Sequence, residues 1–157
     1  MSKSVNCAEA IDNMNRKVAW GLLFVGITYF MQAAEKLLEP GALNSALDIA
    51  SGVGVVLTMG VTLWGIFPVM KLKAGGKLLS KSEPESFMTD AMHTSFKNSW
   101  MVTMITTTVA LAFQKYIDDW NIETSFYLIV LFGFMTLTAS LSFFYLTRND
   151  DVEDLEE

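Results

Sequence analysis

Charged residues are scarce in this chain of 157 residues. They make up 18% of the sequence, against about 25% in an average soluble domain. The mean hydropathy is +0.36, and the apolar residues gather in long uncharged runs. This pattern excludes a disordered chain and argues against a soluble domain. The length fits one domain, so we expect a single polytopic membrane domain over residues 1–157.

Cysteine and histidine are almost absent, with one residue of each. Cys7 has no partner for an internal disulfide, and His93 can supply neither the paired axial ligands of a membrane haem nor a zinc site. The sequence contains no phosphate loop, nucleophile elbow or zinc-protease helix. A formal charge of −6 is also unlike a nucleic-acid-binding domain. We therefore expect no enzymatic activity, no catalytic, cofactor-binding or metal-binding residues, no cofactor and no nucleic-acid partner.

Four apolar segments approach the length of about 20 residues that a membrane helix needs. They are residues 18–34, 49–70, 99–117 and 125–147. The third is the weakest, because its apolar part gives a helix only about 22 Å long and reaches full length by extending to residue 117. We expect an all-α integral membrane protein whose four transmembrane helices form two helical hairpins.

Lysine and arginine are distributed unevenly between the two predicted sides of the membrane. Nine lie on the side of both termini and the central link, and two lie on the other side: Lys3, Arg16, Lys17, Lys71, Lys73, Lys77, Lys81, Lys97 and Arg148 against Lys36 and Lys115. Interfacial anchors are expected near the span ends, where the four tryptophans fall: Trp20, Trp64, Trp100 and Trp120. We therefore expect both termini on the cytoplasmic side of a bacterial inner membrane.

Three polar segments complete the chain: residues 1–17, the link 71–98 and the acidic tail 148–157. In the link, Ser82 followed by Pro84 predicts the start of a helix. Apolar residues then recur at helical spacing, namely Phe87, Met88, Met92 and Phe96. They predict a cytoplasmic amphipathic helix before the third span, either lying on the membrane surface or running directly into the span. These four residues are a possible docking surface for a partner. The acidic tail is predicted to be solvated, and the alternative is a tag that docks a basic partner.

Small and hydroxyl residues stand out in two of the predicted spans. The second span has one every four positions, at Ala50, Gly54, Thr58 and Thr62, a pattern typical of close helix packing. It predicts packing within the protein, a contact between copies of the chain, or a pore lining. In the third span, Thr103, Thr106 and Thr107 offer a possible polar path for an ion or small solute. The alternative is that these hydroxyls bond to carbonyls of their own helix.

Two functions from different classes fit these features. The first is a non-catalytic accessory, anchoring or interaction subunit that binds another membrane protein within the lipid bilayer. The second is a small channel or transporter. Four short helices enclose little of a pathway, so this second function requires a homo-oligomer.

Overall fold

The computed structural model describes residues 7–74, 86–115 and 123–153, and almost all of them are helical. Four helices account for these ranges: α1 (Cys7–Leu37), α2 (Ala42–Ala74), α3 (Phe87–Ala112) and α5 (Thr124–Glu153). No strand occurs in these ranges, so the expected all-α class is confirmed for them. Parts of the sequence prediction lie outside the described residues: Lys3, Lys77, Lys81, Ser82, Pro84, residues 116–117, Trp120 and the end of the acidic tail.

Three of the described helices are long and apolar enough to cross a membrane. These segments are Ala8–Leu37, Ala42–Ala74 and Thr124–Arg148, and they contain the first, second and fourth predicted spans. The composition of α3 does not place it in this group, although its length of 26 residues is sufficient. The structure is therefore that of a membrane protein by the length and composition of three helices.

The predicted amphipathic segment and the predicted third span form one continuous helix, α3. Its N-cap is Ser86, which has an extended backbone and accepts a hydrogen bond from the Thr89 amide at 3.2 Å. Asp90 places a negative charge in the first turn, where the helix dipole favours it. The segment therefore runs directly into the region of the third span, which was one of the two predicted arrangements.

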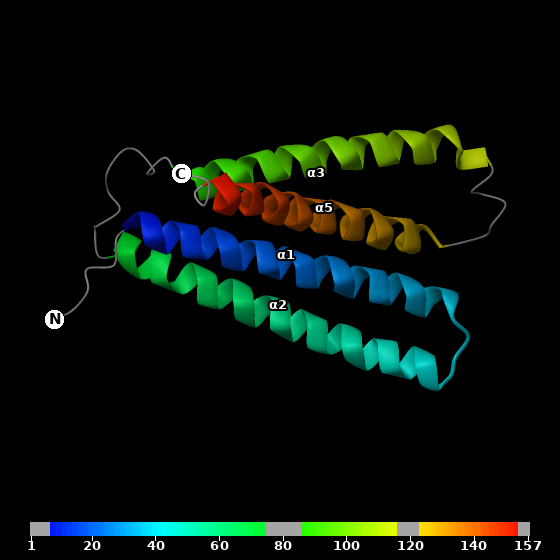
Figure 1. The fold of residues 1–157 in the computed structure, drawn as a ribbon. Helices are drawn as coiled ribbons and strands as arrows, with labels where there is room; N and C mark the ends of the chain where they lie inside the picture. Colours follow the sequence, from blue (N-terminus) through cyan, green and yellow to red (C-terminus); the bar gives the residue numbers. More distant parts are fainter. Residues whose placement is uncertain (1–6, 75–85, 116–122, 154–157) are drawn as a thin grey trace.

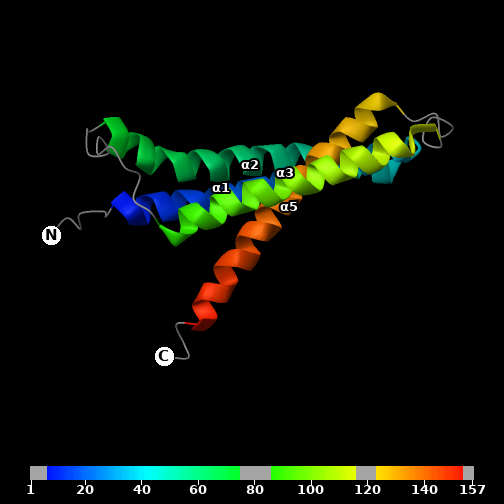
Figure 2. The same cartoon turned by 90° about the horizontal axis from the view of Figure 1, so that it is seen from above.

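The helices lie side by side in the order α2, α1, α5, α3 (Figure 1). Helix α1 packs against α2 and α5, and α5 also packs against α3. Helix α2 contacts neither α3 nor α5, so these helices form an open row instead of a closed bundle. Figure 2 shows that α5 crosses its neighbours at an angle. The start of α1, the end of α2, the start of α3 and the end of α5 all lie at one end of the molecule, called the inner end below.

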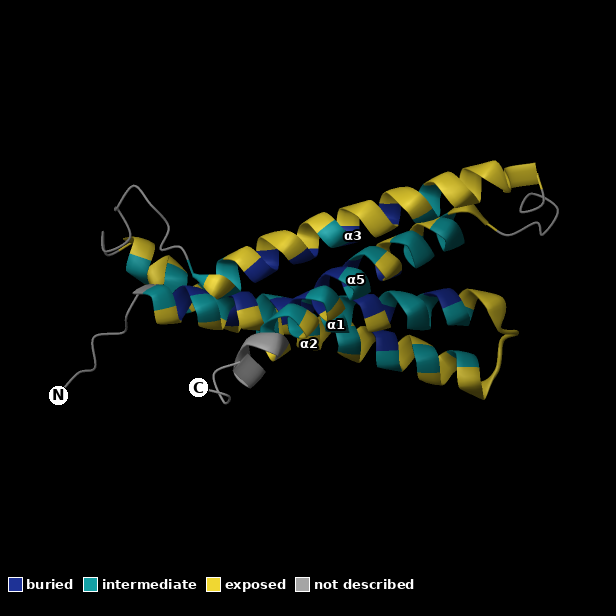
Figure 3. Ribbon diagram, turned by 45° about the horizontal axis from the view of Figure 1, so that its top comes forward, coloured by how far each residue is buried: buried dark blue, intermediate teal, exposed yellow. Residues whose placement is uncertain are grey.

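The small apolar core lies where α1, α3 and α5 meet near the inner end. It consists of Ala19, Ala91, Met92 and Phe143, which are all buried. Among the described residues, eight apolar residues are buried and five of these are alanine, while eight buried residues are Ser, Thr or Asn. In contrast, thirty large apolar side chains are exposed. Figure 3 shows this exposed surface in yellow, most clearly along α3. A small and polar interior with a bulky apolar exterior fits a protein whose surroundings are lipid.

We predict that Ala19→Leu destabilises the row at its core. Ala19 is 0% exposed, so the larger side chain has no free space and must displace α3 or α5. Overpacking of this kind costs about 1–3 kcal/mol in the free energy of unfolding. Titration of the detergent-solubilised protein with sodium dodecyl sulfate measures this quantity. Ala46→Leu is the matched control, since Ala46 is exposed on α2. Equal stability of the two variants would contradict the arrangement of the core.

Candidate functional site

Helices α1 and α2 meet along a seam of small residues. Gly54 lies against the Thr28 side chain, and Gly21 lies against Thr62, so a Cβ atom at either glycine would clash. The Thr28 hydroxyl donates a hydrogen bond to the Phe24 carbonyl at 2.8 Å, so this hydroxyl is satisfied within α1. Two members of the predicted stripe, Gly54 and Thr62, thus contact α1 within the same chain. Ala50, a third member, is half-buried.

Lys17 packs at the inner end of this seam. Its aliphatic stem lies over Gly65, where a Cβ atom would come within 2.9 Å of the lysine Cβ. Its ammonium nitrogen lies 4.7 Å from the centre of the Trp64 ring, a cation–π contact. A charged lysine beside a tryptophan is typical of the membrane–water interface, where both side chains can reach the polar headgroups.

A hydroxyl group connects α1 to α5. Ser140 is fully buried and donates a hydrogen bond to the Ala19 carbonyl at 2.9 Å, across 121 positions of sequence. Further along the same contact, Gly26 lies against Leu137, and Gly133 lies against the Phe30 ring. The backbones of α1 and α5 therefore approach closely, because a glycine lies opposite each of the large side chains Leu137 and Phe30.

Helix α3 is held to α5 in the same way. The Ser99 hydroxyl donates to the Met135 carbonyl at 2.6 Å, and the Asn98 amide donates to the Ser142 hydroxyl at 2.9 Å. The face of α3 toward the interior is a stripe with a step of four residues: Ala91, Ser95, Ser99 and Thr103, all buried. The sequence analysis did not identify this stripe, since it begins in the link and ends in the predicted span. The spacing of four was the signal that could have revealed it.

Two of the three threonines of the predicted polar path donate hydrogen bonds within α3. Thr103 donates to the Ser99 carbonyl and Thr107 donates to the Thr103 carbonyl, each at 2.8 Å. Thr106 is half-buried, and it lies on the same side of the helix as Thr103. The exposed Thr108 follows the same rule and bonds to the Met104 carbonyl. The hydroxyls of Thr103, Thr107 and Thr108 thus donate to carbonyls of their own helix and do not form a row of free donors.

The predicted docking surface is divided by the fold. Met92 is 7% exposed and belongs to the core, and Met88 packs against that core. Phe87 and Phe96 are exposed, at 45% and 47%. These two phenylalanines are thus the exposed members of the predicted surface, and they lie more than two helical turns apart.

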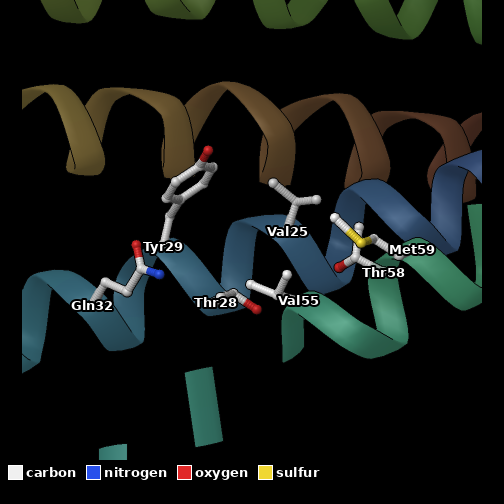
Figure 4. Close-up of a pocket in the computed structure, with 7 residues that line it drawn as sticks. All are labelled: Val25, Thr28, Tyr29, Gln32, Val55, Thr58 and Met59. Carbon is white, nitrogen blue, oxygen red and sulfur yellow. The ribbon is translucent and has the colours of Figure 1, made fainter. Parts of the chain in front are cut away.

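An open cavity of about 230 Å³ lies between α1 and α2 (Figure 4). Its lining residues are Val25, Thr28, Tyr29, Gln32, Val55, Thr58 and Met59. In Figure 4 the side chains of Thr28 and Val55 point toward each other across the two helices. The buried Thr58 hydroxyl oxygen has no hydrogen-bond partner. This mostly apolar cavity has the chemistry to hold an apolar chain, and its residues offer no acid–base pair for catalysis.

Polar contacts tie the helices together at both ends of the row. At the inner end, the Ser86 hydroxyl donates to the Asp12 carboxylate at 2.7 Å, and the Asn15 amide donates to the Thr89 hydroxyl at 3.4 Å. At the opposite end, Lys36 of α1 forms an ion pair with Glu123 at 2.9 Å. These contacts join α1 to α3 at one end and α1 to the start of α5 at the other.

The ion pair lowers the pKa of the Glu123 carboxyl below its ordinary value of 4.5. The causes are the hydrogen bond from Lys36, the hydrogen bond with Ser125 and the positive charge of Lys36, in that order. Because the lowered pKa belongs to the folded state, the pair stabilises that state above the ordinary pKa. This stabilisation is lost as the pH falls through the lowered value.

Within the described ranges no three His, Cys, Asp or Glu residues come together as metal ligands. His93, the single histidine, is exposed on α3. In comparisons with known proteins, no family model, curated protein or solved structure matches the chain.

We predict that Ser140→Ala weakens the contact between α1 and α5. Interhelical hydrogen bonds in a membrane contribute about 0.6 kcal/mol on average, so a loss of this size in the free energy of unfolding is expected. Thr108→Val is the control, because that exposed hydroxyl bonds only to its own helix. If Thr108→Val costs as much as Ser140→Ala, the cross-helix bond has no special role.

We also predict that Lys36→Gln raises the pKa of Glu123 toward its ordinary value. The variant removes the positive charge that favours the carboxylate and replaces the ammonium donor by a shorter, uncharged amide. An NMR titration of the Glu123 carboxyl carbon in micelles measures the pKa directly. Lys115→Gln removes the other predicted outer lysine and should leave that pKa unchanged. An unchanged pKa in Lys36→Gln would mean that the ion pair does not form.

Proposed function

We propose that this protein is a non-catalytic subunit of a membrane assembly, and that the outer face of α2 binds another membrane protein. The observation that carries the proposal is the position of two glycines. Gly52 and Gly60 lie on the side of α2 away from α1, and the space in front of each is open. Val56, between them on the same face, is 70% exposed.

Glycines inside a helix need a structural reason. A glycine costs about 1 kcal/mol relative to alanine in a helix interior. In this chain Gly21, Gly26 and Gly54 each accept a side chain of a neighbouring helix, and Gly65 and Gly133 do the same. Gly52 and Gly60 accept nothing from the part of the chain that the structure describes. A close-packed helix of a partner would give these two glycines the same role as the others.

The open row supports this proposal. Helix α2 touches only α1, so most of its circumference is free for another protein or for lipid. Its exposed side chains are large and apolar, including Val53, Leu57 and Leu63. A partner helix that packs here would contact apolar side chains and glycine backbone, without any charged group to desolvate.

We further propose that all four helices cross the membrane as two hairpins. The mean hydropathy of α3 is lowered most by polar residues of its first half, Asp90, His93, Lys97 and Asn98. Ser95, Ser99 and Thr103 lower it further, and these three are buried against the rest of the protein. Its outer face carries exposed large apolar side chains such as Met101 and Ile105. The surface that would meet lipid is thus apolar, although the average composition of the helix is not.

The proposed orientation has the inner end in the cytoplasm of a bacterial inner membrane. Arg16, Lys17, Lys71 and Lys73 belong to the start of α1 and the end of α2, which both lie at the inner end. Arg148 lies in the last part of α5. The positive-inside rule assigns this side to the cytoplasm.

The pore alternative has less support. It requires free hydroxyls along a path, whereas Thr103 and Thr107 donate to carbonyls of α3. A second copy of this chain is the alternative partner for the α2 face. The crosslinking experiment described next separates it from a different protein.

We predict that a photo-reactive amino acid at Val56 crosslinks to one defined membrane protein in native membranes. The same probe at Ile105, exposed on α3, should crosslink to lipid. Gly60→Leu should reduce the Val56 crosslink at least several-fold, since the larger side chain holds a partner helix away. Ala110→Leu adds the same bulk to an exposed position of α3 and is the matched control.

The identity of the crosslinked product decides between the functions. A different protein supports the subunit proposal. A second copy of this chain supports the oligomeric pore and calls for flux measurements in liposomes. Crosslinks to lipid alone from Val56 would refute the α2 interface.

A further inference from the structure

A polar pocket of about 200 Å³ lies at the inner end, where α1, α3 and α5 meet. It is lined by Arg16, Met88, Phe143, Phe144, Thr147 and Arg148. The two other described cavities have walls that are mostly apolar. This pocket therefore differs from them in chemistry as well as in position.

Two arginine residues from different helices line the pocket. Arg16 comes from α1 and Arg148 from α5, and both residues are exposed. Neither forms an ion pair with any side chain that the structure describes. The carboxylate of Asp12, one turn before Arg16, accepts a hydrogen bond from Ser86. A guanidinium group matches the geometry of a phosphate because it donates two parallel hydrogen bonds.

Apart from Thr147, the rest of the pocket is apolar. Phe143 is 1% exposed, and Met88 and Phe144 pack against the core beside it. Phe144 also contacts the Trp20 ring at a centroid distance of 5.0 Å. A ligand that fits must therefore combine an anionic group with an apolar body. A free inorganic phosphate satisfies only the first requirement.

The two arginines lie at the ends of membrane-spanning segments. Arg16 directly precedes Lys17 and the first apolar run, and Arg148 is the last residue of the apolar segment Thr124–Arg148. Such a position is at the depth of lipid headgroups, where basic pockets between helices bind anionic lipids. The exposed side chains of Tyr145 and Leu141 precede Arg148 on α5, one and two turns further into the apolar segment.

We propose that this pocket binds the phosphate of an anionic phospholipid. Arg16 and Arg148 hold the phosphate from two sides, and the acyl chains lie along the exposed apolar surface of α5. A lipid bound in this way joins α1 to α5 near Ala19, the position where Ser140 also joins them. The proposal depends on the membrane placement of α1 and α5, and it does not depend on any protein partner.

The test is the thermal unfolding midpoint of the purified full-length chain in a neutral detergent. Phosphatidylglycerol should raise the midpoint more than phosphatidylcholine does, and inorganic phosphate should have no effect. In the double variant Arg16→Gln/Arg148→Gln, the apparent affinity for phosphatidylglycerol should fall about thirty-fold. The reason is that each cation near a headgroup contributes about 1 kcal/mol to binding.

The matched control is Lys71→Gln/Lys73→Gln, which removes two charges from the same end on α2, outside the pocket. It should keep the response of the wild-type protein. An equal loss in this control would overturn the proposal, as would a full response of the arginine double variant. An equal shift of the unfolding midpoint with inorganic phosphate would overturn the lipid proposal, because it would show that the pocket binds a free anion. A lipid response that appears only after deletion of residues 150–157 would show that the acidic tail occupies the pocket instead.

Discussion

Hydrogen bonds from buried serine hydroxyls to backbone carbonyls of neighbouring helices are the interaction on which the structure depends. In lipid, apolar side chains gain little by packing against each other, because the surrounding acyl chains are equally apolar. Close backbone approach and interhelical hydrogen bonds must then hold helices together. Ser140 on the Ala19 carbonyl and Ser99 on the Met135 carbonyl provide these bonds. Both depend on small neighbouring residues, since a bulky side chain would hold the helices too far apart.

Helix α1 is the centre of this arrangement because it has two separate small-residue faces. Ala19 and Gly26 face α5, whereas Gly21 and Thr28 face α2. The outer helices need only one such face each, and their remaining surface is exposed and apolar. The row can therefore extend on the side of α2, where Gly52 and Gly60 repeat the same motif without a neighbour from this chain. The proposed partner surface is thus the face of α2 whose glycines have no side chain packed against them.

The sequence predicted the helical class and three helices long and apolar enough to cross a membrane, because long apolar runs carry this information directly. Of the stripe predicted on α2 from its spacing of four, Gly54 and Thr62 contact α1 in the structure. The sequence did not predict the buried stripe of α3. Ser95 and Ser99 look polar by composition, and only contact with α5 shows that they are interior. The same reason explains Met92, which the amphipathic pattern assigned to a docking surface and the fold buries. Periodicity identifies a face of a helix, but it does not tell which neighbour covers that face. The pocket between Arg16 and Arg148 was likewise beyond sequence reasoning, since the two arginines are 132 positions apart and meet only through the packing of α1 on α5.

The central claim is that α3 lies in the membrane with its hydroxyls inward and its apolar side chains outward. Spin-label accessibility in a lipid bilayer tests it most directly, with single cysteines at Met101 and Ile105 in a Cys7→Ser background. Both residues are more than half exposed in the structure. The account predicts labels that collide with apolar oxygen and are protected from a water-soluble nickel complex. Labels at both positions that are open to the nickel complex would place this face of α3 in water and contradict the account.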